Sequence, residues 1–245
     1  MTSTVAPAGR ARRRGLWSTT IGKKLLVAVT GIGWIGFVVV HMIGNLKLFL
    51  GPEGHGDNRP ALNVYGEWLR ELGTPALPRT VLLWMLRFGL LAMFILHVVL
   101  VAVLARRNRA ARPHRYVKTA HVQANPASLM MKWGGVTIGA FLIFHLAHFT
   151  WGVSPDIEFR RGEPYANLTQ AFYHRPWMGA LYLVAMVALA GHLYHGIYST
   201  AQTLGVNRQR RERLIRRIAT TTAALTVGGN VLIILGATLI KNPGY

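Results

Sequence analysis

The chain has 245 residues, of which 51% are hydrophobic, and Lys and Arg outnumber Asp and Glu by 28 to 8. It contains no cysteine, which excludes disulfides, thiolate metal sites and an iron–sulfur cluster held by this chain alone. Several apolar runs of about 18 residues or more indicate an integral membrane protein, so membrane topology explains the net charge of +20 better than nucleic-acid binding does.

The chain begins with a small, polar and basic stretch at residues 1–22, which we interpret as a cytoplasmic N-terminal segment. The apolar run that follows is too long for a signal peptide and lacks a small-residue cleavage site. We therefore place a first spanning helix at residues 24–50 and treat residues 23–245 as one membrane domain. Gly31, Gly33 and Gly36 would let a neighbouring helix or a flat ligand approach this helix closely.

Further apolar runs predict four more spanning helices, at residues 79–104, 130–151, 177–203 and 218–240. Residues 51–79 form a Gly- and Pro-rich loop in which 61–72 has the spacing of a short interfacial helix. The segment between the third and fourth spans is expected to be a loop. The predicted fold class is all-α integral membrane, with five transmembrane helices of which the first four form a bundle.

Basic residues are distributed unequally between the two sides that these helices define. The N-terminal segment and the loops after the second and fourth spans carry almost all of the net positive charge, with Glu212 their one acidic residue. The positive-inside rule therefore predicts a multi-pass protein of the cell inner (cytoplasmic) membrane, with the N-terminus in the cytoplasm and the C-terminus outside.

Each of the first four spans carries a histidine well inside the membrane. At 1.5 Å per residue, these histidines lie roughly 10–16 Å from a helix end. The alternating helix directions then match His41 with His145 in the outer half of the membrane, and His97 with His192 in the inner half. An ionisable side chain at such a depth is costly and is a candidate functional residue.

A histidine pair from facing helices supplies the two axial ligands of a six-coordinate b-type haem, which transfers electrons. Two pairs at different depths predict two haem b groups and a haem-binding bundle. Single membrane histidines are more often packed, hydrogen-bonded bundle residues, but four on separate helices that pair by depth favour haem. Zinc is a weaker candidate because each level offers only two strong nitrogen ligands.

Three further polar residues within the spans have more than one interpretation. His148 and His195 each follow a candidate ligand by three residues, and either can be the ligand itself, a partner of a haem propionate or a quinone contact. Arg87 lies ten residues outward of His97 and either pairs with a propionate or extends to the outer interface. The remaining histidines lie in loops, where solvated side chains are expected: His55, His114, His121 and His174.

These residues resemble the five-helix, two-haem cytochrome b subunit of succinate dehydrogenases and quinol:fumarate reductases. The resemblance covers nearly the whole chain, and it depends on the order and spacing of several short matches. These are STTIGKK at 18–24, HMIGNL at 41–46, Arg87 with His97, FHLAHF at 144–149, and the pattern His-x-x-x-Gly-aliphatic-aromatic formed by His192, Gly196, Ile197 and Tyr198.

The resemblance implies axial ligands His97 and His192 for the inner haem, and His41 and His145 for the outer haem. It selects His192 over His195, whereas the looser match around residue 145 favours His145 over His148. It also implies a flavoprotein subunit and an iron–sulfur subunit on the cytoplasmic face, and quinone, with menaquinone the expected type, as the substrate in the membrane lipid. The chain itself would not act on succinate.

Two alternatives remain open at this point. One is a dihaem cytochrome b of another quinone-linked membrane oxidoreductase. The other is a haem-free membrane anchor or transporter whose histidines carry protons or only pack. The sequence leaves undecided whether the complex oxidises succinate or reduces fumarate.

Overall fold

The computed structural model describes residues 15, 17–51, 59–111, 126–153, 158–206 and 209–240, and only the backbone of residues 126–130. Within these residues the protein is all-α, as expected, and it contains five helices long and apolar enough to cross a membrane. The predicted multi-pass architecture is therefore confirmed. The spanning elements are α1 (Thr20–Asn45) with the short 3-10 helix η1 (Leu46–Phe49), α3 (Val81–Ala110), α4 (Pro126–Leu146) with the π-helical turn η2 (Ala147–Trp151), α6 (Pro176–Thr203) and α7 (Glu212–Leu239).

Several of these helices extend beyond their expected bounds, among them α4, which begins at Pro126. Thr19 caps α1 because its Oγ1 accepts a hydrogen bond from the Gly22 N–H at 3.0 Å, so the helix begins at Thr20. α3 continues to Ala110 and α7 begins at Glu212, so both include arginine-rich sequence that we had assigned to loops. Arginine is a strong helix former, and cations near the C-terminal end of α3 are also favoured by the helix dipole.

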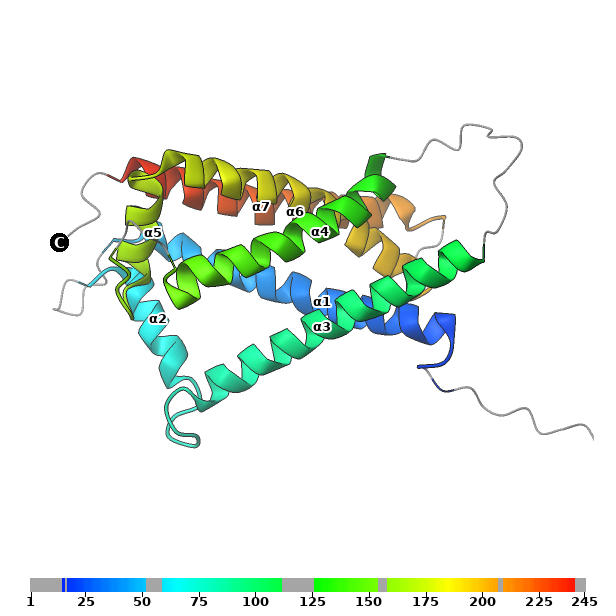
Figure 1. Cartoon of the computed structure of the whole chain (residues 1–245), viewed down its shortest axis with the longest axis horizontal. Coiled ribbons are helices and arrows are strands. Elements are labelled where there is room, and N and C mark those ends of the chain that lie inside the picture. Colours follow the sequence, from blue (N-terminus) through cyan, green and yellow to red (C-terminus); the bar gives the residue numbers. More distant parts are fainter. Residues whose placement is uncertain are drawn as a thin grey trace, which may run out of the picture.

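Two short helices lie together at one end of the molecule (Figure 1). The interfacial helix expected at residues 61–72 is present as α2 (Ala61–Glu71). The second, α5 (Pro164–Tyr173), lies where we expected a loop. Asn63 joins the two helices, because its Oδ1 accepts a hydrogen bond from the Tyr165 N–H at 2.9 Å.

The four histidine-bearing helices have a definite order around the bundle. α1 packs against α3 and α6, and α6 packs in turn against α4. Close contacts between α3 and α4 are few or absent among the described residues, so the bundle is open on that side. The order is therefore α3, α1, α6, α4, which makes α1 and α4 one diagonal pair and α3 and α6 the other. α7 packs against α6 and α1 outside this arrangement.

Basic residues gather at the end of the molecule opposite α2 and α5. The beginning of α1, the end of α3 and the α6–α7 turn all lie at that end (Figure 1). Tryptophans near the helix ends have at least half of their surface exposed, as expected for an aromatic belt at the two membrane interfaces. They are Trp17, Trp84, Trp133, Trp151 and Trp177.

Candidate functional site

The two outer histidines meet across a diagonal of the bundle. His41 of α1 and His145 of α4 have ring centroids 5.9 Å apart, with ring planes at 89°. Their helices make few or no close backbone contacts among the described residues, so the two side chains bridge the interior. Phe37 stacks on His41 one turn away, at 5.4 Å between ring centroids. The Asn45 side-chain amide lies 3.2 Å from His41 Nε2 and donates to it.

A tyrosine that the sequence analysis did not single out lies at the centre of the outer level. Tyr182 of α6 is buried, and its hydroxyl lies 3.0 Å from His148 Nδ1 and 3.4 Å from His145 Nδ1. Phe172 of the unexpected helix α5 packs edge-on against the Tyr182 ring, at 5.0 Å between centroids. The sequence held one signal for Tyr182, its depth in the membrane. Tyr182 precedes His192 by ten residues on the same helix, and this places it outward of His192, at the outer level.

His148 belongs to the same cluster. Its side chain is 2% exposed, its ring stacks on Phe149 at 4.1 Å, and its Nε2 is buried without a hydrogen-bond partner. It lies in the π-helical turn η2, a type of irregularity that is frequent at functional sites. The ring contact with His41 is made by His145, whereas the ring contacts of His148 are with Phe144, Phe149 and Tyr182. The ligand role of His145 stays a prediction that this arrangement favours.

At the inner level, the orientation of His97 is fixed by a threonine of the neighbouring helix. Thr30 donates its hydroxyl proton to the carbonyl oxygen of Leu26 or Val27, at 2.9 and 3.1 Å. The Thr30 oxygen therefore accepts from His97 Nδ1–H, at 3.0 Å. This hydrogen bond selects the tautomer with a lone pair on Nε2, which is the form that binds a metal ion.

His192 lies on α6, which is diagonally opposite α3, the helix that carries His97. The Nδ1 of His192 is buried and has no hydrogen-bond partner. Glycines lie against both inner rings: a Cβ added at Gly31 would lie 3.6 Å from His97 Cε1, and one added at Gly135 would lie 3.4 Å from His192 Cε1. Side chains larger than glycine at these positions would take up the space beside the two imidazoles.

The other candidate residues lie outside these two pairs. His195 is half-buried beside the Tyr194 ring, at 5.0 Å between centroids. Arg87 is exposed and stacks over Trp84, with its guanidinium carbon 4.9 Å from the ring centroid. His174 is exposed at the end of α5. The remaining loop histidines, His55, His114 and His121, lie outside the described residues.

The donor set fits haem better than a bare metal ion. Metal–imidazole bonds of about 2 Å on opposite sides of one ion place the ring centroids about 6 Å apart, close to the 5.9 Å between His41 and His145. Across the part of the chain that the structure describes, no three His, Cys, Asp or Glu side chains group as metal ligands. A structural zinc needs four protein ligands, whereas haem iron needs only two axial ones.

A further buried polar atom without a hydrogen-bond partner lies on α1, between the two levels. The indole Nε1 of Trp34 is buried without a hydrogen-bond partner, and its ring packs edge-on against Phe37 and Phe94, at 5.4 and 5.9 Å. A buried N–H without an acceptor is costly, so such a donor is a candidate contact for a polar group of a bound cofactor.

Comparison of the chain with protein-family models, with curated proteins and with solved structures found no match.

Proposed function

We propose that this chain is the dihaem cytochrome b that anchors a succinate:quinone oxidoreductase in the membrane. The observation that carries the proposal is the ring contact of His41 with His145 across one diagonal of a four-helix bundle, while His97 and His192 lie on the two helices of the other diagonal. Packed bundle histidines would not need to pair in this way. The two levels supply the ligands for two b-type haems, and a bundle core is a common place for such a cofactor.

The chain's own residues would hold and orient the two haems. His97 and His192 would be the axial ligands of the inner haem, and His41 and His145 those of the outer haem. Each haem, when bound with both axial positions filled, supplies a one-electron carrier. Thr30 would hold His97 in the tautomer with a free Nε2, and Tyr182 would accept the Nδ1–H of His145. The aromatic rings of Phe141, Phe149 and Phe172 around Tyr182 exclude water from the outer level.

The partner subunits would bind at the basic end of the molecule. Exposed arginines of α3 and α7 gather there, including Arg106, Arg107, Arg213 and Arg217. We place this end in the cytoplasm by the positive-inside rule. Docked there, an iron–sulfur subunit would lie nearest the inner histidine pair, which makes that pair the first to receive electrons from succinate. Quinone, which we expect to be menaquinone, would be the electron acceptor within the membrane.

Purification of the intact complex from its native membrane tests this proposal. The expected preparation contains this chain with a flavin-containing subunit and an iron–sulfur subunit, and it reduces a soluble quinone analogue with electrons from succinate. A complex carrying His97→Ala should retain succinate oxidation by a direct dye acceptor and lose most quinone reduction. Co-purification with a hydrogenase-type or other non-flavin partner would overturn the succinate assignment, and a complex without haem absorption bands, from haem-sufficient cells, would overturn the haem assignment.

A further inference from the structure

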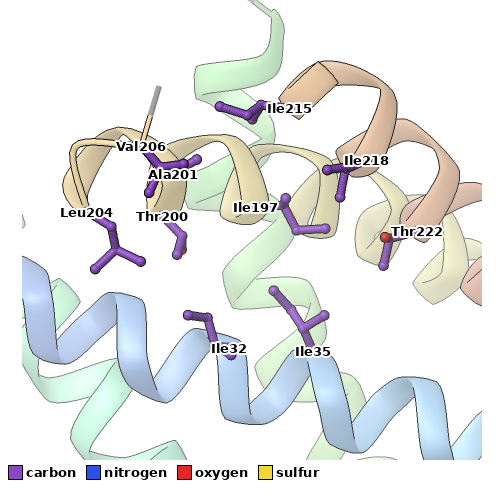
Figure 2. Close-up of a pocket in the computed structure, with 10 residues that line it drawn as sticks. All are labelled: Ile32, Ile35, Ile197, Thr200, Ala201, Leu204, Val206, Ile215, Ile218 and Thr222. Atoms are coloured by element: carbon purple, nitrogen blue, oxygen red, sulfur yellow. The ribbon is translucent and has the colours of Figure 1, made fainter. Parts of the chain in front are cut away.

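An apolar groove lies near the basic end of the molecule, where α1, α6 and α7 meet (Figure 2). It has a cavity volume of about 370 Å³, within the range of ligand-binding pockets. Aliphatic side chains form most of its lining, including Ile32 and Ile35 below and Ile197 and Ile218 above; the hydroxyls of Thr200 and Thr222 are its polar groups. No histidine of either level lines it, so it is separate from the candidate haem site.

The groove lies at the depth of the part of the lipid acyl chains that is next to the headgroups. Its lining extends from Ile197 through the last turn of α6 to Leu204 and Val206, which follow the end of that helix. A helix that ends at Thr203 reaches the interface there. An elongated apolar chain that enters the groove would therefore carry its polar end at the level of the α6–α7 turn.

Two exposed basic residues precede lining residues of the groove on α1 and α7. Arg211 lies one helical turn before Ile215, a lining residue, and Lys24 lies two turns before Ile32 on α1; both side chains are exposed. The nearby carboxylate, Glu212, is already bound by Arg216 at 2.7 Å and accepts a hydrogen bond from the Tyr198 hydroxyl at 3.3 Å. Among the described residues, neither Lys24 nor Arg211 has an acidic partner.

We infer that this groove binds one anionic phospholipid of the leaflet on the basic side. An acyl chain fills the aliphatic groove, and the phosphate is held at its mouth by Lys24 and Arg211. Basic pockets between spanning helices on the cytoplasmic side bind acidic headgroups by this combination of charge and apolar surface. The lining has no aromatic ring to stack on a quinone head, which favours a lipid as the occupant.

Native mass spectrometry of the detergent-purified complex tests this inference with two probes, dioleoyl phosphatidylglycerol and dioleoyl phosphatidylcholine. We expect one phosphatidylglycerol to bind more tightly than phosphatidylcholine. The double variant Lys24→Gln with Arg211→Gln should weaken phosphatidylglycerol binding about thirtyfold and leave phosphatidylcholine unchanged, because only the charge term is lost. The matched pair Arg87→Gln with Arg161→Gln removes the same charge from exposed positions at the opposite end of the molecule, away from the proposed partner surface, and should change neither affinity.

A second variant probes the groove itself. Ala201→Trp fills it with a large side chain and should weaken both lipids alike. If that variant does not fold, the charge pair still decides the question, because its members are exposed. Equal affinities for the two lipids, or an undiminished preference in the double variant, would overturn the inference. Displacement of the bound lipid by a short-chain menaquinone analogue would also overturn it and would assign the groove to quinone. The haem content of the same samples reports separately on the proposed function.

Discussion

The single hydroxyl of Tyr182 lies near the Nδ1 atoms of two histidines, His145 and His148, which differ in their other contacts. His145 also contacts His41, whereas His148 is enclosed by Phe149 and Phe144. If His145 is the ligand, Tyr182 is the acceptor that orients it, as outer hydrogen-bond partners commonly do for metal-binding histidines. Substitutions of the histidines and of Tyr182 separate the ligands from the residues that position them.

His41→Ala and His145→Ala should each eliminate the outer haem and leave the inner one, because each removes one of two axial ligands. His148→Ala should keep both haems, since it removes only a packed neighbour. Haem quantified per chain, together with the reduced-minus-oxidised optical spectrum, measures this outcome. His174→Ala is the control, because that side chain is exposed outside the bundle. Loss of a haem in His148→Ala and not in His145→Ala would exchange the two roles.

Tyr182→Phe should retain both haems and raise the midpoint potential of the outer haem. The hydrogen bond from His145 Nδ1–H increases electron donation by the imidazole, which stabilises the oxidised iron, so its loss favours reduction. A hydrogen bond contributes about 0.5–1.5 kcal/mol, which for one electron corresponds to tens of millivolts. A redox titration of the variant measures the shift. An unchanged outer potential, or a shift confined to the inner haem, would contradict this role.

The sequence singled out the four histidines that we propose as haem ligands, but not the residues that orient them. Depth within a helix follows directly from counting residues, because the rise per residue is fixed. Hydrogen bonds such as Thr30 to His97 and Tyr182 to His148 join residues 67 and 34 positions apart. Which face of one helix meets which face of another depends on side-chain packing, and the apolar runs are too uniform to define it.

Among the elements, α5 is the one that the sequence analysis missed. It is ten residues long, and its polar residues Asn167 and Thr169 are buried, so its pattern does not resemble an amphipathic helix. Asn167 accepts from the Arg160 N–H at 2.9 Å and donates to the Arg160 carbonyl at 2.7 Å, which explains its burial. The spanning helices were predictable because each needs only length and apolar composition.

The close contact between α7 and α1 depends on Gly229, which packs against Met42. A Cβ on Gly229 would overlap the buried Met42 side chain, whereas one on the adjacent Gly228 would meet open space. Gly229→Val should therefore lower the Tm of the purified protein by several degrees, as overpacking costs about 1–3 kcal/mol. Gly228→Val introduces the same β-branched residue one position away and is the matched control. Equal Tm values for the two variants would mean that α7 does not pack closely on α1.

At the scale of the whole molecule, the concentration of basic residues at one end predicts its orientation. The chain lacks cysteine, so a single introduced thiol reports its own side of the membrane. Ala76→Cys in the turn before α3 and Gln209→Cys before α7 both place it at an exposed position. In intact cells a membrane-impermeant maleimide should label Ala76→Cys, and it should label Gln209→Cys only after permeabilisation. The reverse pattern would place the basic end outside.

The architecture as a whole was predictable from the sequence only in part. The five spans could be predicted from the sequence because they depend on length and apolar composition. The two histidine depths follow from counting residues and stay a prediction. The order α3, α1, α6, α4, which makes each histidine pair a diagonal pair, could not be predicted, because it depends on which helix surfaces pack together. With that order, the two histidines of each proposed pair lie on diagonally opposite helices of one bundle.

The central claim is that these two sites hold two haems. The most direct measurement is the reduced-minus-oxidised optical spectrum of the purified membrane complex, with haem quantified per copy of this chain. Two b-type haems per chain are the predicted result. A single haem would contradict one of the two histidine pairs, and protein without haem, from cells with an adequate haem supply, would contradict the account.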